Sequence, residues 1–488
     1  MALSGGLITC KLEHSHKVLI VNSYATDLYL SWSIEFWERL KQVPFTDAGF
    51  LDVSSASFDK QLLIRARFKR FLTGARTIER VLARKYLPLE DHQIYASFWR
   101  IRFMQAKCAL NLMKIFPHLL RAKHVNDFLN IPVVNFSALR STHSTLAGKI
   151  GTVEYSPRRY CLRIFLYLIS YIVVQTLVSR VIIAHNYCQV TVGNGRLLNA
   201  ASVLSGARNI STLVIERGAM PGMLDSYCVS AHSMSERRAH LNYAWESVDR
   251  DLAEKIAVSY LETRKNRDPI SGVSWTSKQR SGVIPEIDAG KKVCVFYTTT
   301  ELEFAVFFDS PNSGEFSTQN EALRALIESL DSHEWVIFVR RHPYSRMMSH
   351  DPEGRNWSEF KRFKHVKFIS PDSNVDSYAL GARADLVAHF NSSIGPELVY
   401  QGSCPVITMG DNSWELTDSK YLLRNQCALL EFLESQPGIR PRSDAFKWAY
   451  YSATFGEKFR LVEWRNFRGY IDGKHLLSQN TNFKLMGK

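Results

Sequence analysis

A regular alternation of short apolar runs and helical segments in the second half of the chain constrains the fold most. The predicted strands are Val293–Tyr297, Trp335–Val339, His365–Ile369, Leu386–His389 and Pro405–Met409. Helices are predicted between them, at Gln319–Leu330, Asp376–Ala382 and Ile394–Tyr400. Short buried strands joined by helices need crossover connections, so the pattern predicts a parallel sheet covered by helices.

The first half shows a weaker form of the same alternation. Residues 29–120 have mostly helical spacing, and helices are also predicted at Arg196–Ser205 and Ser235–Glu262. The strand candidates are His16–Val21, Val133–Phe136, Val181–Ala184, Val190–Val192 and Thr212–Ile215. Strands that alternate with helices favour an α/β domain here too.

The length and a change in composition predict how the chain divides. A chain of 488 residues is long enough for two or three domains. Residues 264–292 are rich in Lys, Arg, Ser, Gly and Pro, which is typical of a linker. The predicted fold class is therefore α/β, with two Rossmann-like domains that face each other across a cleft. The predicted domains are residues 1–270, with helical insertions, and 290–440, followed by a helical tail at 441–488 that packs back on the first domain.

The net positive charge limits the classes of binding partner to be expected. The formal net charge is +14, but the chain has no zinc-finger spacing, no RNP-type aromatic motif and no long Lys/Arg block, so nucleic acid is not expected. Anionic lipid headgroups or a negatively charged substrate remain. The apolar stretch Ile164–Val178 is shorter than the ~20 residues that span a bilayer, which favours a buried helix. Contact with a membrane surface is the alternative, because Arg158, Arg159 and Arg163 flank it.

The cysteines and the N-terminus bear on the compartment. None of the eight cysteines forms a CxxC pair, and several lie in apolar surroundings, which is typical of a reducing compartment. Residues 1–10 lack the charged start and apolar region of a signal peptide. We expect a cytoplasmic protein, peripheral to the inner membrane through its basic surface and region 158–180.

Polar or small residues follow four successive strands of the second half. They are Arg340, Arg341, His342 and Pro343; Asp372, Ser373, Asp376 and Ser377; Asn391, Ser392, Ser393, Gly395 and Glu397; and Gly410, Asp411 and Asn412. In open α/β sheets, ligands bind outside the carboxyl ends of the strands. The sequence therefore predicts a binding site at this edge of the second sheet.

The residue types at this edge suit a phosphate group. Ser392 and Ser393 lead directly into a helix, where hydroxyls, free N–H groups and the helix dipole favour an anion. An ordinary N-cap is the alternative. His342 could donate to a phosphate oxygen or protonate it. Glu397 could accept bonds from two ribose hydroxyls, or only place favourable charge near the helix N-terminus.

A family resemblance rests on these motifs. The strings VIFVRRHPYS and VKFISPDSNVDSYALGARADLVAHFNSSIGPELVYQGSCPVITMG resemble the C-terminal half of GT-B glycosyltransferases of capsule biosynthesis, a group related to the β-Kdo transferases. The HP and Ser-Ser motifs also resemble those of bacterial CMP-sialic-acid transferases of the GT-B type. In those enzymes the histidine and the serine pair hold the nucleotide phosphate. The resemblance implies this role for His342, Ser392 and Ser393.

The same resemblance assigns residues 290–440 to the nucleotide-sugar-binding domain. The string CVFYTTTELEFAVF resembles the first βα unit of such a domain. The predicted nucleotide-binding residues are Thr298, Thr299, Arg340, His342, Pro343, Asp372, Ser377, Ser392, Ser393 and Glu397.

The first domain resembles the acceptor half of related transferases. VTVGNGRLLNAASVL is followed by STLVIERGAMPGML, where such enzymes have an acidic-X-Gly step whose carboxylate serves the chemistry. Here the step is Glu216-Arg217-Gly218, with Arg217 where an acid often stands. We predict Glu216 as the base that deprotonates the acceptor, acting with His342. An ion pair between Glu216 and an arginine is the alternative. Asn194, Arg196 and Arg217 are predicted on the acceptor side, with Asp225 and His232 as alternative bases.

The resemblance implies a metal-independent enzyme without a cofactor, because its nucleotide-sugar donor is a substrate. The expected reaction moves a sugar, with a CMP-linked sugar such as Kdo or sialic acid favoured, to a glycan or glycolipid acceptor of capsule or lipopolysaccharide. A polyol-phosphate transferase of teichoic-acid type is one alternative. A non-catalytic polysaccharide-binding or assembly protein on the same fold is the other. No metal site is predicted, since His and acidic residues do not fall at ligand spacings on one element.

Overall fold

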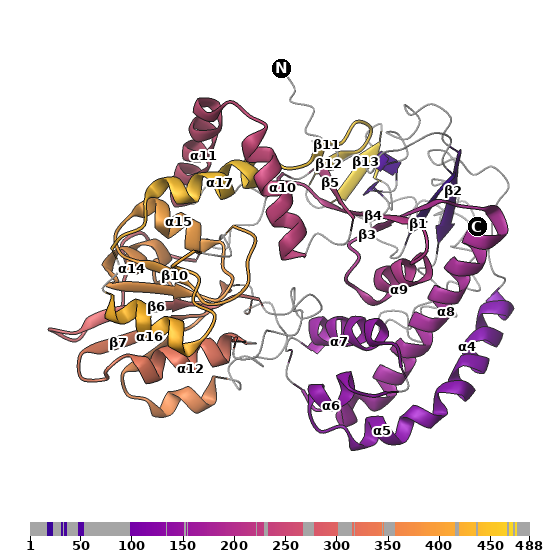
Figure 1. Cartoon of the computed structure of the whole chain (residues 1–488), viewed down its shortest axis with the longest axis horizontal. Helices are drawn as coiled ribbons and strands as arrows, with labels where there is room; N and C mark the ends of the chain where they lie inside the picture. Colours follow the sequence, from indigo (N-terminus) through magenta and orange to yellow (C-terminus); the bar gives the residue numbers. More distant parts are fainter. Residues whose placement is uncertain are drawn as a thin grey trace, which may run out of the picture. The chain divides into compact units, whose positions relative to one another are not determined.

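The computed structural model describes most of the chain from Phe98 onward and short segments before it (Figure 1). The described residues are 17–22, 31–32, 34–36, 47–52, 98–132, 134–150, 153, 155–220, 222–228, 233–266, 278–300, 315–316, 318–343, 345, 357–414, 419–435, 438–465, 468–471 and 474–475.

The chain forms two compact units. Unit 1 contains Met1–Leu146, Tyr155–Ala231 and Gly456–Lys488, and unit 2 contains Ala147–Glu154 and His232–Phe455. The main division therefore lies near residue 231, not in the predicted linker at 264–292. Each unit is built on a mainly parallel sheet, so the α/β, Rossmann-like prediction is confirmed at the level of fold class.

The sheet of unit 2 has the strand order of a dinucleotide-binding fold. Its five strands are parallel and lie in the order β10-β9-β6-β7-β8. The central strand is the first in the chain, and the chain adds strands first on one side and then on the other. The bounds are β6 Lys292–Tyr297, β7 Trp335–Arg340, β8 Val366–Ile369, β9 Leu386–His389 and β10 Val406–Thr408.

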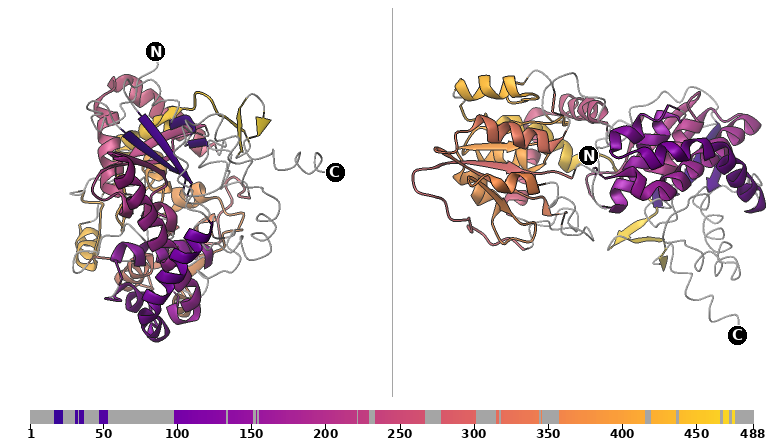
Figure 2. Two further views of the ribbon diagram at one scale, coloured as in Figure 1. Left: turned by 90° about the vertical axis from the view of Figure 1, so that its right-hand side faces the viewer. Right: turned by 90° about the horizontal axis from the view of Figure 1, so that it is seen from below.

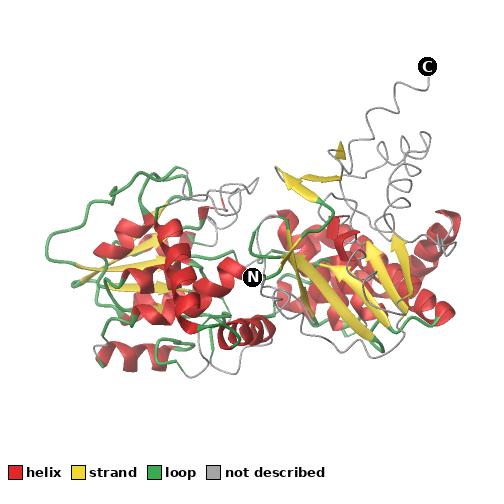
Figure 3. Ribbon diagram, turned by 90° about the horizontal axis from the view of Figure 1, so that it is seen from above, coloured by secondary structure: helices red, strands yellow, loops and turns green. Residues whose placement is uncertain are grey.

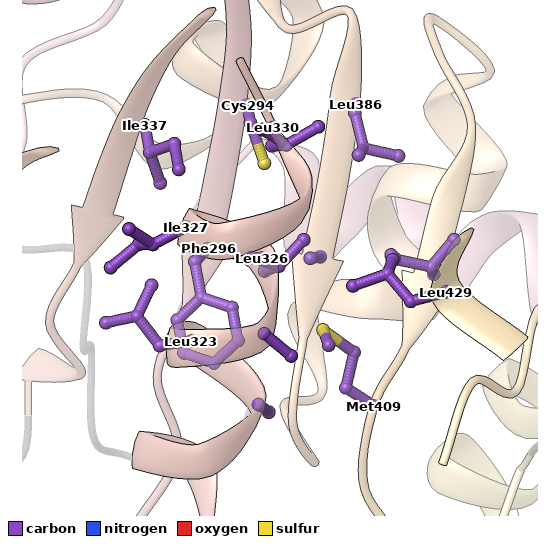
Figure 4. Packing of buried hydrophobic residues seen from close by; sticks show 14 of the residues in the cluster. Cys294, Phe296, Leu323, Leu326, Ile327, Leu330, Ile337, Leu386, Met409 and Leu429 are labelled. Atoms are coloured by element: carbon purple, nitrogen blue, oxygen red, sulfur yellow. The ribbon is translucent and has the colours of Figure 1, made fainter. Parts of the chain in front are cut away.

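Helices cover both faces of this sheet (Figure 3). On one face, Cys294 and Phe296 of β6 pack in a core with α12 and α16 (Figure 4). On the other, Val293, Val295 and Tyr297 pack with α11, α14, α15 and α17. The period of two that strands impose on side chains puts alternate residues into these two cores. The bounds are α12 Gln319–Ser329, η7 Ser358–Arg362, α14 Ser377–Arg383, α15 Ile394–Gln401, α16 Gln426–Glu434, η8 Arg442–Ala445 and α17 Phe446–Thr454.

Two helices predicted for the first domain belong to unit 2. The helix expected at Ser235–Glu262 is two helices, α10 Met234–Glu246 and α11 Arg250–Lys265. The two helices are separate because Asp249 begins a new one: its Oδ1 accepts the N–H of Leu252 and so caps α11. The face of α11 formed by Ala253, Ala257 and Leu261 packs into the core of unit 2, which explains why the boundary lies before these helices.

The sheet of unit 1 is parallel over four strands and antiparallel at one edge. Its order is β11-β5-β4-β3-β1-β2, and β5 and β11 run antiparallel to their neighbours. Figure 2 shows β1 and β2, in indigo, side by side. The bounds are β1 Lys17–Asn22, β2 Asp47–Asp52, β3 Gln189–Gly193, β4 Ser211–Arg217, β5 Met223–Tyr227 and β11 Glu457–Lys458. The strand at 47–52 was not predicted.

A long buried helix covers one face of this sheet. α8, Cys161–His185, packs with α9, Leu198–Gly206, against Val190 and Val192 of β3. It is long and apolar enough to cross a membrane, but 61% of its most apolar window is buried in the protein. The predicted strand Val181–Ala184 is wrong, because it lies in α8. The strand predicted at Val133–Phe136 is also wrong where it is described, since Phe136 begins α7.

Further helices precede α8 in the chain, and α4, α5 and η4 pack against it. Their bounds are α4 Phe98–Leu112, η3 Met113–Ile115, α5 Phe116–Arg121, α6 Val125–Leu129, α7 Phe136–Ile150 and η4 Pro157–Tyr160. Phe116 meets Phe165 of α8 edge to face, with ring centroids 5.6 Å apart. α4 and α5 therefore form an outer helical layer of unit 1.

The C-terminal segment returns to unit 1 as strands. β11 adds to the sheet beside β5, and β12 Glu463–Arg465, β13 Arg468–Ile471 and β14 Lys474–His475 form a small antiparallel sheet. The buried carboxylate of Glu35 accepts backbone N–H bonds from Arg460 and Leu461, both at 2.7 Å. Over the described residues, the tail predicted to be helical at 441–488 is helical only at η8 and α17, both within unit 2.

Candidate functional site

The strand order of unit 2 defines a switch point between β6 and β9. Successive strands are added on opposite sides of β6, so the loops that follow β6 and β9 diverge at the carboxyl edge of the sheet. Ligands of open α/β folds bind at such a point. Two predicted groups lie here: Thr298 and Thr299 after β6, and Ser392 and Ser393 after β9. His342 follows the adjacent strand, β7.

Hydrogen bonds tie these three loops together. Thr298 Oγ1 accepts the backbone N–H of His342 at 2.8 Å, and Thr299 Oγ1 donates to Asn391 O at 2.8 Å. Gln319, at the start of α12, accepts from Thr299 N at 3.0 Å and donates to Thr299 O at 3.3 Å. The threonine side chains are therefore used to fix the loops, which leaves the binding of a ligand to other groups.

Arg340 is a buried cation without a carboxylate partner. Only 2% of its surface is exposed. Its Nε donates to Ser377 Oγ at 3.2 Å and its Nη1 to Ser370 O, both neutral acceptors. Its Nη2 is buried without a hydrogen-bond partner, and no described carboxylate forms an ion pair with it. Burial lowers the pKa of Arg340 from its usual value, although the guanidinium stays charged.

Such a cation is expensive unless an anion joins it. Removing an ion from water costs roughly several kcal/mol in proteins. A buried N–H donor without a hydrogen-bond acceptor adds to that cost. Arg340 lies at the carboxyl end of β7, and its positive charge reaches the imidazole of His342. A ligand phosphate at this edge of the sheet would supply the missing negative charge.

His342 is held as a neutral imidazole. Burial, with a contribution from the Arg340 guanidinium, lowers its pKa to about 4. Ser345 N and Ser345 Oγ both donate to His342 O, at 3.0 and 2.6 Å, and so close a turn around half-buried Pro343. At neutral pH the side chain can give a ring N–H to a phosphate oxygen. Protonation of that oxygen would first require the phosphate to raise the pKa of His342.

The loop after β9 leads into a helix N-terminus supported by a second buried histidine. His389 Nδ1 accepts Ser392 N at 3.2 Å, so Nε2 carries the proton and lies 3.2 Å from Thr408 Oγ1. Ser392 is buried, whereas Ser393 is exposed and its side chain makes no cap hydrogen bond to α15. A Cβ at Gly395 would lie 2.2 Å from His389 Nε2, so only glycine fits there.

Acid should weaken this histidine-supported loop. Burial lowers the pKa of His389 to about 3, below the 6.5 expected when unfolded, so the unfolded chain binds the proton first as the pH falls. The contribution is complete above pH 6.5 and is lost towards pH 3. Between pH 7 and pH 5 we expect protonation of the unfolded chain at His389 to lower the free energy of unfolding by about 2 kcal/mol. Over the same interval, calorimetry should show that the free energy of unfolding of His389→Asn falls by about 2 kcal/mol less than that of wild type. Equal losses would contradict the neutral imidazole.

Two predicted nucleotide-binding residues are already engaged. Glu397 accepts from Arg264 Nε at 2.7 Å and from Tyr378 OH at 2.6 Å. A ribose hydroxyl would have to displace one of these bonds. Asp372 is exposed and pairs with Lys278 at 2.7 Å. Both carboxylates thus join segments of unit 2, Glu397 through α11 and Asp372 through the stretch that follows residue 277.

Glu216, in unit 1, lies near the carboxyl end of β4. Its Oε2 accepts from Asn194 Nδ2 at 2.8 Å, and its Oε1 accepts from Arg217 N at 3.0 Å. Asn194 has a left-handed backbone (φ +71° in the loop after β3), which turns its side chain within reach. Burial raises the pKa of Glu216, although these bonds and the charges of Arg196 and Arg217 oppose the rise. A raised pKa makes the carboxylate a stronger base for an acceptor hydroxyl.

A second carboxylate stands opposite Glu216. Asp225 of β5 is its register partner across the antiparallel pair, at a separation where side chains on one face interact. Both residues are half-buried. The predicted base and the alternative base Asp225 are therefore neighbours, while His232 lies outside the described residues. Arg217 is exposed.

The structure adds partners that the sequence did not indicate. Gln319, Arg264 and Tyr378 hold the predicted residues through contacts between separate elements. Gln319 had a local signal, because Thr318 caps the helix that it begins. Among the described residues, no three His, Cys, Asp or Glu side chains gather as a metal site would require.

Comparisons with known proteins give distant likenesses. No protein-family model matches the chain, and no curated protein matches its sequence. The β-Kdo 2,4 transferase KpsC of Thermosulfurimonas dismutans is 15% identical, with 60% of this chain and 84% of that one covered and a TM-score of 0.34. The UDP-GlcNAc 2-epimerase of Methanocaldococcus jannaschii is 11% identical over 97% and 100%, with a TM-score of 0.29. The wall teichoic acid polymerase TagF is 13% identical over 62% and 57%, with a TM-score of 0.22.

Proposed function

We propose that the chain is a glycosyltransferase that uses a nucleotide-activated donor. The observation that carries the proposal is Arg340, a buried guanidinium without a carboxylate partner at the carboxyl edge of a Rossmann-type sheet. His342 follows β7 and the N-terminus of α15 follows β9, the two strands that flank β6 in the same sheet. A cation, a neutral imidazole and a helix N-terminus together favour a phosphate group. The HP and Ser-Ser motifs support a CMP-linked sugar of the Kdo or sialic acid type as donor.

The reaction assigns different work to the two units. In unit 2, Arg340, His342, the Ser392 hydroxyl and the backbone N–H groups at the start of α15 bind the phosphate that leaves with the electron pair of the sugar–oxygen bond. In unit 1, Glu216 takes the proton of an acceptor hydroxyl while that oxygen bonds to the sugar carbon. The acceptor we propose is a growing capsule or lipopolysaccharide glycan. Turnover requires the two units to bring Glu216 and the bound donor together.

A nucleotide screen tests the donor site. A ligand at ~100 times its dissociation constant should stabilise the folded protein by about 2.7 kcal/mol. We expect cytidine monophosphate to raise the unfolding temperature, and cytidine, which lacks the phosphate, not to do so. If no nucleotide stabilises the protein, or if cytidine does so equally, the phosphate site is not where we place it.

The new linkage separates transfer of a sugar from transfer of a polyol phosphate. After incubation with an activated donor and an acceptor glycan, a glycosyltransferase product gains the mass of the sugar alone. A product that gains phosphorus would instead show a polyol-phosphate transferase. Binding of nucleotide without turnover of any activated donor would indicate a non-catalytic binding protein.

A further inference from the structure

One segment, nearly all of it in unit 1, carries most of the chain's net positive charge. Residues 92–215 contain fourteen Lys and Arg but only two acidic residues, Asp127 and Glu154, a net charge of +12 out of +14 for the whole chain. The segment includes α4, η3, α5, η4 and α8. Nine of the fourteen cations lie on these five elements, so electrostatics would direct an anionic partner there.

The outer helix of this layer also exposes large apolar side chains. α4 runs alongside α8 (Figure 1) and buries Gln105, Cys108 and Leu112. On its opposite face, Phe103 is 71% exposed and Leu110 76% exposed. At 100° per residue these two side chains share one stripe, because they are seven positions apart.

Lysines lie within the same stripe, and the pattern continues beyond α4. Lys107 is exposed between Phe103 and Leu110. In η3 and α5 the exposed residues include Met113, Lys114, Leu120 and Arg121. By contrast, α10, α11 and α16 of unit 2 each expose one large apolar side chain, Tyr243, Leu252 and Leu430. Isolated exposure of that kind is ordinary, whereas an apolar stripe with interleaved cations is not.

A neighbouring turn extends the surface. Arg158 N donates to Ala122 O at 3.1 Å, which fixes η4 beside the end of α5. Arg158 and Arg159 are exposed there, and Leu162 of the adjoining α8 is 62% exposed. Asp127, the acid that follows α5, uses a carboxylate oxygen to accept the N–H groups of Lys123 and His124. Cations and apolar tips thus recur over three consecutive elements and η4.

We propose that this surface, formed by α4, η3, α5 and η4, binds an anionic lipid bilayer. Exposed Phe and Leu between Lys and Arg suit the interface between headgroups and acyl chains, where apolar tips enter and cations remain at the headgroups. A nucleic acid would use the cations but would gain nothing from the apolar stripe. This surface differs from the apolar body of α8, which is buried. The inference is independent of the proposed donor site.

Vesicle sedimentation of the full chain tests the surface. Wild type should bind vesicles of about 70% phosphatidylcholine and about 30% phosphatidylglycerol, because each basic residue near an anionic surface contributes about 1 kcal/mol to binding. It should bind pure phosphatidylcholine much more weakly. Raising the salt to about 1 M shortens the Debye length to ~3 Å and should release part of the bound protein.

A matched pair of variants locates the contact. Leu110→Ser with Lys114→Gln removes one apolar tip and one charge, and should weaken binding at least about fivefold, the factor for one basic residue near the surface. Leu252→Ser with Lys255→Gln makes the same changes on exposed positions of α11 and should bind as wild type does. Unfolding temperatures of both variants check that they fold.

Three results would overturn the proposal. The first is failure of wild type to bind the anionic vesicles. The second is equal binding by wild type and the α4–η3 variant. The third is self-association that the same variant abolishes, without vesicle binding, which would assign the surface to a second copy of the chain.

Discussion

Replacing Glu216 by Gln is expected to lower turnover by about 10²–10⁴ while nucleotide affinity stays near that of wild type. The change preserves the size of the side chain and removes its basicity. Glu216 lies in unit 1, and the proposed phosphate-binding residues lie in unit 2, so binding and chemistry should separate. Steady-state kinetics with an activated donor, together with nucleotide titration, measure both quantities.

The pH profile distinguishes a base from a residue that only positions the acceptor. Burial raises the pKa of Glu216, so wild-type turnover should fall with decreasing pH at a higher pH than for an ordinary glutamate. Glu216→Gln should lose this acid limb. Exposed Glu431→Gln on α16 is the control and should leave both rate and profile unchanged. If Glu216→Gln retains full turnover, Asp225, its cross-strand neighbour, becomes the base to test.

Arg340→Met should weaken nucleotide binding by about tenfold to a hundredfold. The reason is the loss of one or more charge-assisted hydrogen bonds to phosphate, each contributing roughly 1.5–3 kcal/mol. Stability without nucleotide should behave differently. The variant loses the bonds to Ser377 and Ser370 but also removes a buried cation that lacks a carboxylate partner. These effects oppose each other, so we expect the free energy of unfolding to stay within about 2 kcal/mol of wild type.

Exposed Arg383→Met at the end of α14 is the matched control, and it should change neither binding nor stability. For Arg340→Met, stability and nucleotide affinity must be measured together. If Arg340→Met unfolds at a much lower temperature and still binds nucleotide normally, the guanidinium has a structural role, and the phosphate lies elsewhere.

The second sheet could be predicted closely because its strands are short, apolar and bounded by polar residues. Leu386–His389 has the predicted bounds, and no end of the other four strands differs from its prediction by more than one residue. In the first half, the strand predictions were wrong where a helix has the composition of a strand. Val181–Ala184 is β-branched and apolar, yet it continues α8, because a buried helix and a buried strand share that composition. The two-residue strand β11 is too short to carry a pattern.

The positions of the candidate site could be predicted, but the partners of its side chains could not. The rule that ligands bind at the carboxyl ends of strands places Thr298, His342 and Ser392 at one edge of the sheet. Local sequence does not show that Glu397 meets Arg264, which is 133 residues away, or that Asp372 meets Lys278. Nor does it show that Arg340 is buried without a carboxylate partner, the feature that now carries most of the functional proposal.

The most direct test is a calorimetric titration of cytidine monophosphate into wild type, His342→Ala and Ser392→Ala. We expect saturable binding at one site in wild type. Each variant removes a contact to a charged phosphate, so its affinity should fall by about tenfold to a hundredfold. Wild-type affinity in both variants, or no binding of the nucleotide by wild type, would contradict a phosphate site at the carboxyl edge of the second sheet.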